Sequence, residues 1–427
     1  MKALVIGGGG REHALAWKLA ASPHADIVYV APGNAGTAGE AGVENVDVAA
    51  EDIDGLLAFA ASEAIDLTVV GPEAPLVAGV VDRFAAAGLR CLGPVSAAAR
   101  LEGSKAFCKD FMLRHKIPTA RYDVYTELAE ASAALAGRRF PLVVKADGLA
   151  AGKGVVIAAD RAQAQAALED MLVDDRFGAA GRRVVIEDFI EGEEASFICL
   201  ADGETVLPFA TSQDHKARDD GDLGPNTGGM GAYSPAPVVD AALHERIMET
   251  VIRPTLAGMV ADGHPYRGFL YAGLMIDADG IPQVLEFNCR FGDPETQPIM
   301  MRLKSDLFEA ALAAVDGGLG DIQLEWDPRA ALGVVVAAGG YPGDYDKGKV
   351  ITGLDADLPD SKVFHAGTRL EHGAVLTSGG RVLCVVGLGD SVGAAQRLAY
   401  ARGDRISFDG AFCRRDIGYR AIARERG

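Results

Sequence analysis

The first hundred residues alternate short β-forming runs with helix-forming segments, and this alternation restricts the fold more than any other feature. The β-forming runs are residues 3–6, 27–30 and 67–70, and each ends in a loop rich in glycine or proline. Segments of helical composition follow them, at 14–20, 53–61 and 77–87. This βαβα order predicts a parallel sheet with helices on both faces. Ligands bind such sheets at the carboxyl ends of the strands, where these loops lie.

The rest of the chain predicts mixed sheets. Strands at 141–145 and 155–158 are expected to form a hairpin around a glycine-rich loop, followed by a helix over 161–172. A second hairpin joins 270–276 to 283–287. The other expected elements are strands at 184–189, 195–200, 332–337, 363–365 and 382–386 and a helix at 392–401. We therefore expect an α/β and α+β multidomain chain, whose last segment begins near residue 327.

Length and charge exclude several classes of protein. A chain of 427 residues is long enough for about three domains. Its 41 Lys and Arg against 60 Asp and Glu give a net charge of −19, so we expect no nucleic-acid partner. No apolar run reaches the ~20 residues of a membrane span. The six cysteines form no C-x-x-C pair, which favours reduced thiols and a cytoplasmic location.

The loop at Gly7–Gly10 lies between the first strand and a helix. Such a helix start binds anions through its backbone N–H groups and its dipole, so a single phosphate is expected there. Dinucleotide binding is discounted, because Glu12 stands where G-x-G-x-x-G needs its third glycine and the second strand lacks an acidic end. A tight turn without a ligand is the structural alternative.

Two further segments are rich in glycine and polar residues. The loop 147–154 contains Lys153 between glycines and follows Lys145, so it is suited to close over a triphosphate, although an ordinary hairpin loop is the alternative. Segments 211–216 and 224–231 predict a site-lining loop, against an exposed Ω-loop. His215 has no partner by spacing, which favours a structural histidine.

A carboxylate and an amide stand two residues apart on one expected strand. Glu286 and Asn288 would therefore point to the same side of the sheet, and this oxygen pair suits Mg²⁺, which keeps substrate phosphates as further ligands. Arg290 would share that face if the strand continued, and could bind a carboxylate or phosphate bidentately. A solvated strand face is the alternative.

Taken in order, these segments resemble the glycinamide ribonucleotide synthetase family of the ATP-grasp superfamily. The resemblance rests on GGGGREHALAW at 7–17, APGNAGT at 31–37, GPEAPL at 71–76, EGSKAF at 102–107 and KADGLAAGKGV at 145–155. It continues through ATSQDHK at 210–216, GPNTGGMGAYSPAP at 224–237, GFLYAGLMID at 268–277, EFNCRFGDPETQ at 286–297, GGYPGDY at 339–345 and CRRDIGYRAI at 413–422. It covers essentially the whole chain.

The resemblance implies a fold and a reaction. The fold would comprise an N-terminal parallel-sheet (pre-ATP-grasp) domain at 1–102, an ATP-grasp region at 103–326 with a smaller lid at 121–188, and a small C-terminal α+β domain at 327–427. The reaction would be ATP-dependent ligation of glycine to 5-phosphoribosylamine through glycyl phosphate, in de novo purine biosynthesis. Mg²⁺ or Mn²⁺ would be the cofactor, and a transient contact with the upstream amidotransferase is expected.

The resemblance also implies roles for particular residues. Glu286 and Asn288 would hold the metal, and Arg290, Asp214 and Lys145 would be catalytic. The ATP-binding residues would be Lys105, Lys145, Gly152, Lys153, Glu187, Asp188, Phe189, Ile190, Glu194, Lys216 and Asn226. The substrate-binding residues would be Gly9, Gly10, Arg11, Gly33, Asn34, Gly36, Glu73, Asp214, Arg290 and Asp293.

The sequence departs from the family pattern at three places, and other functions stay open. Gly8 replaces a more usual Asn, Ala217 stands where relatives often have Arg (Arg218 follows), and the strand at 274–276 lacks an acidic metal ligand. The alternatives are another ATP-grasp enzyme such as a carboxylase, a dinucleotide-dependent oxidoreductase and a non-catalytic binding protein.

Overall fold

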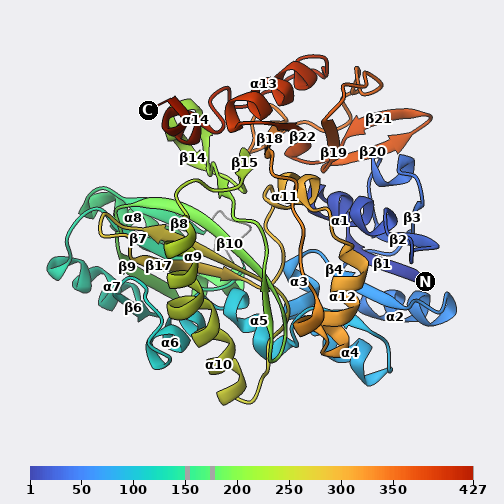
Figure 1. Cartoon of the computed structure of the whole chain (residues 1–427). Helices are drawn as coiled ribbons and strands as arrows, with labels where there is room; N and C mark the ends of the chain where they lie inside the picture. Colours follow the sequence, from blue (N-terminus) through green and yellow to red (C-terminus); the bar gives the residue numbers. More distant parts are fainter. Residues whose placement is uncertain (150–153, 174–177, 427) are drawn as a thin grey trace.

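The computed structural model describes residues 1–149, 154–173 and 178–426 (Figure 1). The predicted Gly152 and Lys153 lie outside the described residues. The architecture combines an N-terminal parallel sheet, two antiparallel sheets of four strands and a C-terminal sheet of five strands. Across the described residues, no helix combines the length and apolar character needed to cross a bilayer.

The N-terminal sheet is entirely parallel, with the strand order β3-β2-β1-β4-β5. Its strands are β1 (Lys2–Gly7), β2 (Ile27–Pro32), β3 (Val43–Asn45), β4 (Leu67–Val70) and β5 (Cys91–Leu92). Its helices are α1 (Gly10–Ala20), α2 (Ile53–Ser62), α3 (Glu73–Val77), α4 (Val80–Ala86) and α5 (Ser96–Gly103). Leu4 and Ile6 share one core with α2 and α4, whereas Ala3 and Val5 share another with α1. The predicted coverage of both faces is thus confirmed.

One predicted helix of this domain is wrong. Residues 77–87 form the end of α3 and the whole of α4, not one helix. Gly79 separates them with φ +87°, a left-handed conformation that no α-helix continues through and that glycine adopts without steric cost. The first of the two short helices, α3, begins at Glu73, three residues after the end of β4.

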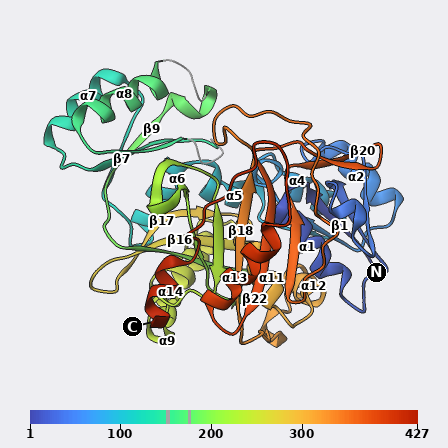
Figure 2. The same ribbon diagram turned by 90° about the horizontal axis from the view of Figure 1, so that it is seen from above.

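A small antiparallel sheet forms a separate lobe at one end of the molecule (Figure 2). Its strands, in the order β6-β9-β7-β8, are β6 (Tyr122–Tyr125), β9 (Val184–Asp188), β7 (Leu142–Ala146) and β8 (Val155–Ala158). The helices α7 (Leu128–Ala134) and α8 (Arg161–Leu172) cover one face. Because side chains alternate along β7, Leu142 and Val144 pack under these helices, and Val143 and Lys145 point to the other face.

The second four-stranded sheet has the order β11-β10-β16-β17 and is antiparallel. Its strands are β10 (Glu193–Asp202), β11 (Val206–Pro208), β16 (Arg267–Ile276) and β17 (Pro282–Asn288). The helices near it are α6 (Lys105–Arg114), α9 (Ala241–Ile247), α10 (Arg253–Ala261) and α12 (Leu307–Asp316). Phe197, Leu274 and Phe287 are buried in the core beneath it, which holds the sheet against the N-terminal domain.

The C-terminal sheet has the order β12-β15-β18-β22-β19. Its strands are β12 (Gln213–Asp214), β15 (Gly231–Ser234), β18 (Ala330–Ala337), β22 (Arg381–Gly389) and β19 (Ser361–His365). Two short hairpins, β13 (Ala217–Asp219) with β14 (Leu223–Asn226) and β20 (Thr368–Glu371) with β21 (Ala374–Thr377), extend from it. The helices are α11 (Thr296–Arg302), α13 (Val392–Gly403) and α14 (Tyr419–Arg426). Two strands from the middle of the chain therefore complete the C-terminal sheet.

Candidate active site

A cleft of about 710 Å³ lies where the N-terminal sheet, the two antiparallel sheets and the C-terminal domain meet. Sixteen of the residues predicted from the sequence line it. They are Arg11, Glu73, Lys105, Lys145, Glu187, Asp188, Phe189, Ile190, Glu194, Asp214, Lys216, Asn226, Glu286, Asn288, Arg290 and Asp293. Arg218, the candidate substitute for the missing Arg at 217, pairs with Asp219 instead and is absent from this lining.

The carboxylate–amide pair lies at the end of β17. Phe287 is buried in the core, and Glu286 and Asn288 on either side of it line the cleft, as predicted. The Glu286 side chain is 37% exposed, and its carboxylate lies 3.9 Å from Lys216 Nζ. Burial would raise the pKa of Glu286, but Lys216, Lys145 and Lys105 hold it below its usual value. An ionised carboxylate with a neighbouring amide oxygen fits the donor set of Mg²⁺.

Asp214 and Lys216 face the cleft from one short segment, because the intervening His215 points the other way. Lys216 Nζ lies 3.1 Å from Glu194 Oε2. Burial would lower the pKa of Lys216, yet Glu194 and Asp214 raise it well above its usual value. Burial, reinforced by Glu295 and Glu194 and opposed by Lys216, raises the pKa of Asp214 well above its ordinary value. The segment thus offers a permanent cation beside a carboxylate.

A buried cluster of two lysines and one glutamate forms the wall beneath the small lobe. Glu187 forms ion pairs with both lysines: its Oε2 lies 2.9 Å from Lys109 Nζ, and its Oε1 lies 3.0 Å from Lys145 Nζ. Burial would raise the pKa of Glu187, but both lysines hold it below its usual value. Lys145 also donates to the backbone carbonyl of Leu285, 3.1 Å away, which links this lobe to β17.

Lys109 was missed by the sequence reasoning, although α6 carried a signal for it. It stands four residues after Lys105, and residues at this spacing share one helix face. Both side chains line the cleft, and Lys105 Nζ donates to the Gly148 carbonyl at 3.0 Å. Burial lowers the pKa of both ammonium groups. The face of α6 therefore presents two poorly hydrated cations, a setting that suits phosphate oxygens.

Arg290 lies just beyond β17 and joins the cleft to the N-terminal domain. Its Nη2 lies 2.9 Å from Glu102 Oε1, and its Nε lies 3.3 Å from Glu73 Oε2. Glu102 also accepts the backbone N–H of Cys289 at 2.7 Å. Burial raises the pKa of Glu102 to about 6, despite the opposing effect of Arg290. Glu102, which the sequence reasoning did not single out, fixes the orientation of the guanidinium.

A second arginine reaches the cleft from the C-terminal domain. Arg381, on β22, has its Nη2 3.2 Å from Asp293 Oδ2, and its Nη1 donates to the Asp293 carbonyl at 2.8 Å. Gln297 donates to the other carboxylate oxygen at 2.9 Å. Burial would raise the pKa of Asp293, but Arg381 and Arg11 hold it below its usual value. No local pattern in the sequence connects Arg381 to Asp293, so the pair was not predicted.

At the start of α1, the Glu12 carboxylate accepts hydrogen bonds from its own neighbours in the chain. Glu12 accepts the backbone N–H of Gly9 at 2.6 Å and Arg11 Nε at 2.5 Å. Gly9 and Gly10 are absent from the lining of the cleft, whereas Arg11 forms part of it. Of these first residues of α1, Arg11 therefore reaches the cleft, and phosphate binding by Gly9 and Gly10 stays a prediction.

The loop after β2 is also absent from the cleft lining. The Asn34 amide group donates to the carbonyls of Gly8 (3.0 Å) and His365 (2.8 Å), and its carbonyl accepts the N–H groups of Gly36 and Thr37. Gly36 packs so closely on His13 and His365 that a Cβ would lie 2.4 Å from the first ring. Asn34 and Gly36 thus hold the loop against β19, and the substrate contacts of Gly33, Asn34 and Gly36 stay predictions.

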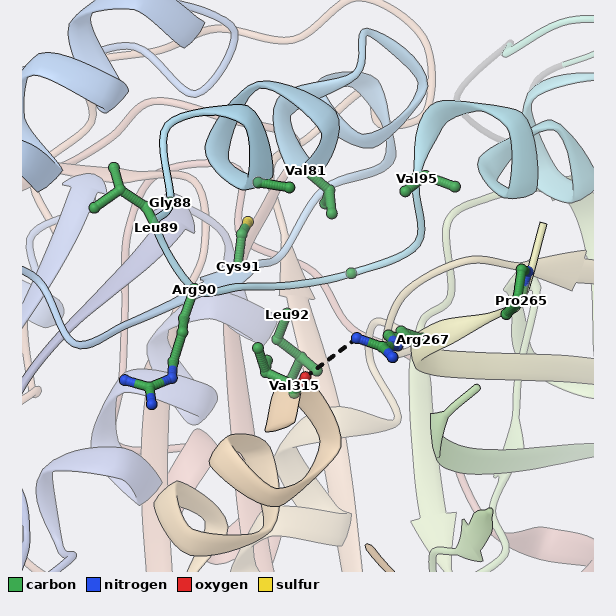
Figure 3. A pocket seen from close by; sticks show the side chains of 12 residues that line it. Val81, Gly88, Leu89, Arg90, Cys91, Leu92, Val95, Pro265, Arg267 and Val315 are labelled. Carbon is green, nitrogen blue, oxygen red and sulfur yellow. Dashed lines mark hydrogen bonds between the residues drawn. The ribbon is translucent and has the colours of Figure 1, made fainter. Parts of the chain in front are cut away.

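A smaller cavity, of about 250 Å³, lies elsewhere in the molecule (Figure 3). Mostly apolar side chains line it, among them Val81, Leu92 and Val315, together with the stems of Arg90 and Arg267. Arg267 donates to the Val315 carbonyl at 3.3 Å. None of the predicted site residues that the structure describes lines this cavity, and we assign the chemistry to the larger cleft.

Comparisons with known proteins cover the whole chain. Three family models described as Phosphoribosylglycinamide synthetase match it: the N domain at residues 1–102, the ATP-grasp (A) domain at 103–296 and the C domain at 331–420. A phosphoribosylamine–glycine ligase from Allochromatium vinosum is 66% identical over 428 residues, covering all of both chains.

Solved structures of similar fold include a phosphoribosylamine–glycine ligase. The crystal structure of a phosphoribosylamine–glycine ligase from Thermotoga maritima has a TM-score of 0.86 at 34% identity, covering 98% of this chain and 100% of that one. A biotin carboxylase from Campylobacter jejuni, in a complex with an ATP analogue, has a TM-score of 0.76 at 14% identity, covering 96% and 92%, and shows only the shared fold. The ATP-grasp architecture expected from the sequence is thus confirmed. The chain belongs to the phosphoribosylglycinamide synthetase family.

Proposed function

We propose that this chain catalyses the ATP-dependent ligation of glycine to 5-phosphoribosylamine, giving glycinamide ribonucleotide, ADP and phosphate. A glycine carboxylate oxygen attacks the γ-phosphorus of ATP, and the bond to the bridging oxygen breaks to release ADP. The amine of phosphoribosylamine then attacks the acyl carbon of glycyl phosphate. The C–O bond to phosphate breaks, phosphate leaves, and the new amide nitrogen loses a proton. The full-length identity to phosphoribosylamine–glycine ligases supports this reaction.

One observation carries the proposal: a single cleft contains both the cationic wall and the Glu286–Asn288 pair, and it opens to the N-terminal domain at Glu73 and Arg11. Phosphoryl transfer needs aligned reactants and compensated charge rather than a covalent nucleophile. Lys105, Lys145 and Lys216 supply positive charge along the wall. The reacting molecules can therefore meet in this one cavity.

The nucleotide and metal sites follow from the same geometry. Phe189 and Ile190 supply apolar surface for a base, and the lysines of α6 and β7 lie within the same lining for the phosphates. Glu286 and Asn288 would hold Mg²⁺ or Mn²⁺. When bound, the metal would supply charge neutralisation on the phosphate oxygens.

The acceptor sites are assigned by charge. Asp214 would pair with the glycine ammonium group and Arg290 with a carboxylate or phosphate oxygen, since the guanidinium is fixed by Glu102 and Glu73. Arg11, Glu73 and Asp293 would contact phosphoribosylamine at the edge of the N-terminal sheet. We also propose a cytoplasmic location, the domain limits 1–102, 103–326 and 327–427, a lid at 121–188, and a transient contact with an upstream amidotransferase.

An ADP-release assay tests the proposal against the alternatives. ATP and Mg²⁺ are supplied with glycine, phosphoribosylamine, both, or bicarbonate, and the product is identified by mass. We expect rapid ADP release and glycinamide ribonucleotide only when both acceptors are present. Release stimulated by bicarbonate instead would favour a carboxylase. Tight binding of NADH would favour the dinucleotide-dependent oxidoreductase. No ADP release under any of these conditions would favour a non-catalytic binding protein.

A further inference from the structure

The segment that carries Asp214 and Lys216 continues into a hairpin that rests on the C-terminal end of the chain. Residues 217–226 form β13 and β14, joined by a tip at 220–222. Thr227 closes the hairpin by donating its N–H to the Lys216 carbonyl at 2.8 Å. The tip lies against residues 414–420, from the CRRDIGYRAI motif at 413–422 that the reaction chemistry leaves without a role.

Arg414 is the central contact between the two segments. Its side chain is fully buried, with 0% exposure, and its Nη1 donates to Asp222 Oδ1 (2.9 Å) and to the Ala217 carbonyl (3.1 Å). Its Nε and Nη2 form a bidentate pair with Asp416, at 2.8 and 2.9 Å. A planar guanidinium satisfies these acceptors together, and a lysine ammonium cannot.

Other contacts reinforce the same junction. Asp222, at φ +58°, also accepts the Tyr419 hydroxyl at 2.7 Å and Arg420 Nη2 at 2.6 Å. His215, which lies between the two cleft residues, accepts the backbone N–H of Gly418 on Nε2 at 2.9 Å. The neutral ring therefore carries its proton on Nδ1. This histidine is structural, as expected, and its partner is the distant C-terminal segment.

We infer that Arg414 is a positioning residue, which fixes the 213–226 segment and thereby places Asp214 and Lys216 in the cleft. The inference rests on the proposed function for the roles of these two residues. Arg414 itself is absent from the cleft lining and contacts the hairpin through Asp222 and the carbonyl of Ala217, the residue after Lys216. Its loss would remove the cation that Asp222 and Asp416 share and loosen the hairpin tip, which would keep only the backbone hydrogen bonds of Gly221 and Arg415 and the contacts of Asp222 with Tyr419 and Arg420.

The position of the hairpin predicts that loss of Arg414 affects the binding of some substrates and not of others. The hairpin contributes to the sites proposed for ATP and glycine, whereas the residues proposed for phosphoribosylamine, which are Arg11, Glu73 and Asp293, lie outside the 213–226 segment. Displacement of a binding group by ~1 Å costs up to about 100-fold. Arg414→Gln should therefore raise KM for ATP and for glycine by about 10- to 100-fold and leave KM for phosphoribosylamine unchanged.

The experiment compares Arg414→Gln, Arg414→Lys and Arg415→Gln with the full-length wild-type chain. Arg415 is the matched control, since its side chain is exposed and pairs with Asp404 on the C-terminal domain. KM values come from ADP release, and dissociation of a non-hydrolysable ATP analogue is measured by calorimetry. We expect the Lys variant to recover part of the affinity, because it keeps a positive charge between the two aspartates, and the Arg415 variant to behave as wild type.

Unchanged KM and analogue affinity in Arg414→Gln would overturn the inference, as would an equal rise in all three KM values. If that variant does not fold, Tyr419→Phe removes one Asp222 contact at the surface and should give a smaller shift in the same two constants. Binding of the ATP analogue separates the positioning role of Arg414 from the proposed function, because it is measured without turnover. Weakened analogue binding in a chain whose wild type never releases ADP would refute the proposed function and leave the positioning role intact.

Discussion

Arg290 and Glu102 form an ion pair of 2.9 Å across the boundary between the ATP-grasp sheet and the N-terminal domain. Glu73 lies 3.3 Å from the same guanidinium, on the side of the parallel sheet. Burial would lower the pKa of Arg290, but Glu102 and Glu73 raise it, so the group stays charged. The pair joins the ATP-grasp sheet to the N-terminal domain, and the proposed transfer of an activated acyl group to a second substrate needs such a connection.

Glu286→Gln should abolish ADP formation while the chain stays folded. The substitution keeps the shape of the side chain and removes the only charge of the proposed metal pair, so the loss in kcat should be about 10³-fold or more. Steady-state kinetics and circular dichroism check the two parts. Glu245→Gln is the control, since Glu245 is exposed and pairs with Arg253. A fully active Glu286 variant would refute the metal assignment.

Asp214→Asn should raise KM for glycine by about 10-fold or more and leave KM for phosphoribosylamine unchanged, because a neutral amide cannot pair with the ammonium of glycine. In the wild type, kcat/KM for glycine should fall with decreasing pH at values above the usual range of an aspartate, since burial raises the pKa of this group. A pH–rate profile measured for each substrate checks this. An equal rise of both KM values would contradict the assignment.

Local signals predicted many elements to the residue. The helix 161–172 and the strands 67–70 and 155–158 have the limits expected from the sequence. Asp160 caps that helix by accepting the N–H of Gln163, a signal that lies entirely within the segment. The shared orientation of Glu286 and Asn288 towards the cleft also depends on local alternation along one strand.

Contacts between distant segments were not predictable. Arg381 meets Asp293 from another domain, 88 residues away, and Glu102 reaches Cys289 over 187 residues. Nothing in the spacing of these residues encodes the approach of two sheets. His215 shows the same limitation, because its partner Gly418 lies on the last turn of the chain before α14. Arg381 and Glu102 thus share one property: their partners come from the packing of whole domains, whereas Lys109 could have been found from its spacing to Lys105.

The stability of Glu102→Gln relative to wild type should depend on pH. The folded pKa of Glu102 is raised to about 6 from 4.5, so its ionisation costs stability as pH rises between these values. The shift corresponds to about 2 kcal/mol at pH 7 and to none well below pH 4.5. Urea unfolding of the variant and of wild type should be measured at pH 7 and well below pH 4.5. Between the lower and the higher pH, the free energy of unfolding of the variant should increase by that amount relative to the wild-type value. A constant difference would contradict the raised pKa.

Asn34→Ala should lower the free energy of unfolding by about 1–3 kcal/mol, since it leaves the buried His365 carbonyl and two backbone N–H groups without partners. If the loop also positions phosphoribosylamine, KM for that substrate should rise while KM for ATP stays constant. Urea unfolding and steady-state kinetics measure the two effects separately. An unchanged unfolding free energy would show that the hydrogen bonds of Asn34 do not stabilise the loop.

The most direct measurement is oxygen transfer from glycine to phosphate. Glycine labelled with ¹⁸O in its carboxylate is incubated with ATP, Mg²⁺, phosphoribosylamine and the full-length chain, and the phosphate released is analysed by mass spectrometry. Because the carboxylate oxygen attacks the γ-phosphorus and leaves with it, each phosphate should carry one ¹⁸O atom. Phosphate without the label, released together with glycinamide ribonucleotide, would contradict the acyl phosphate route.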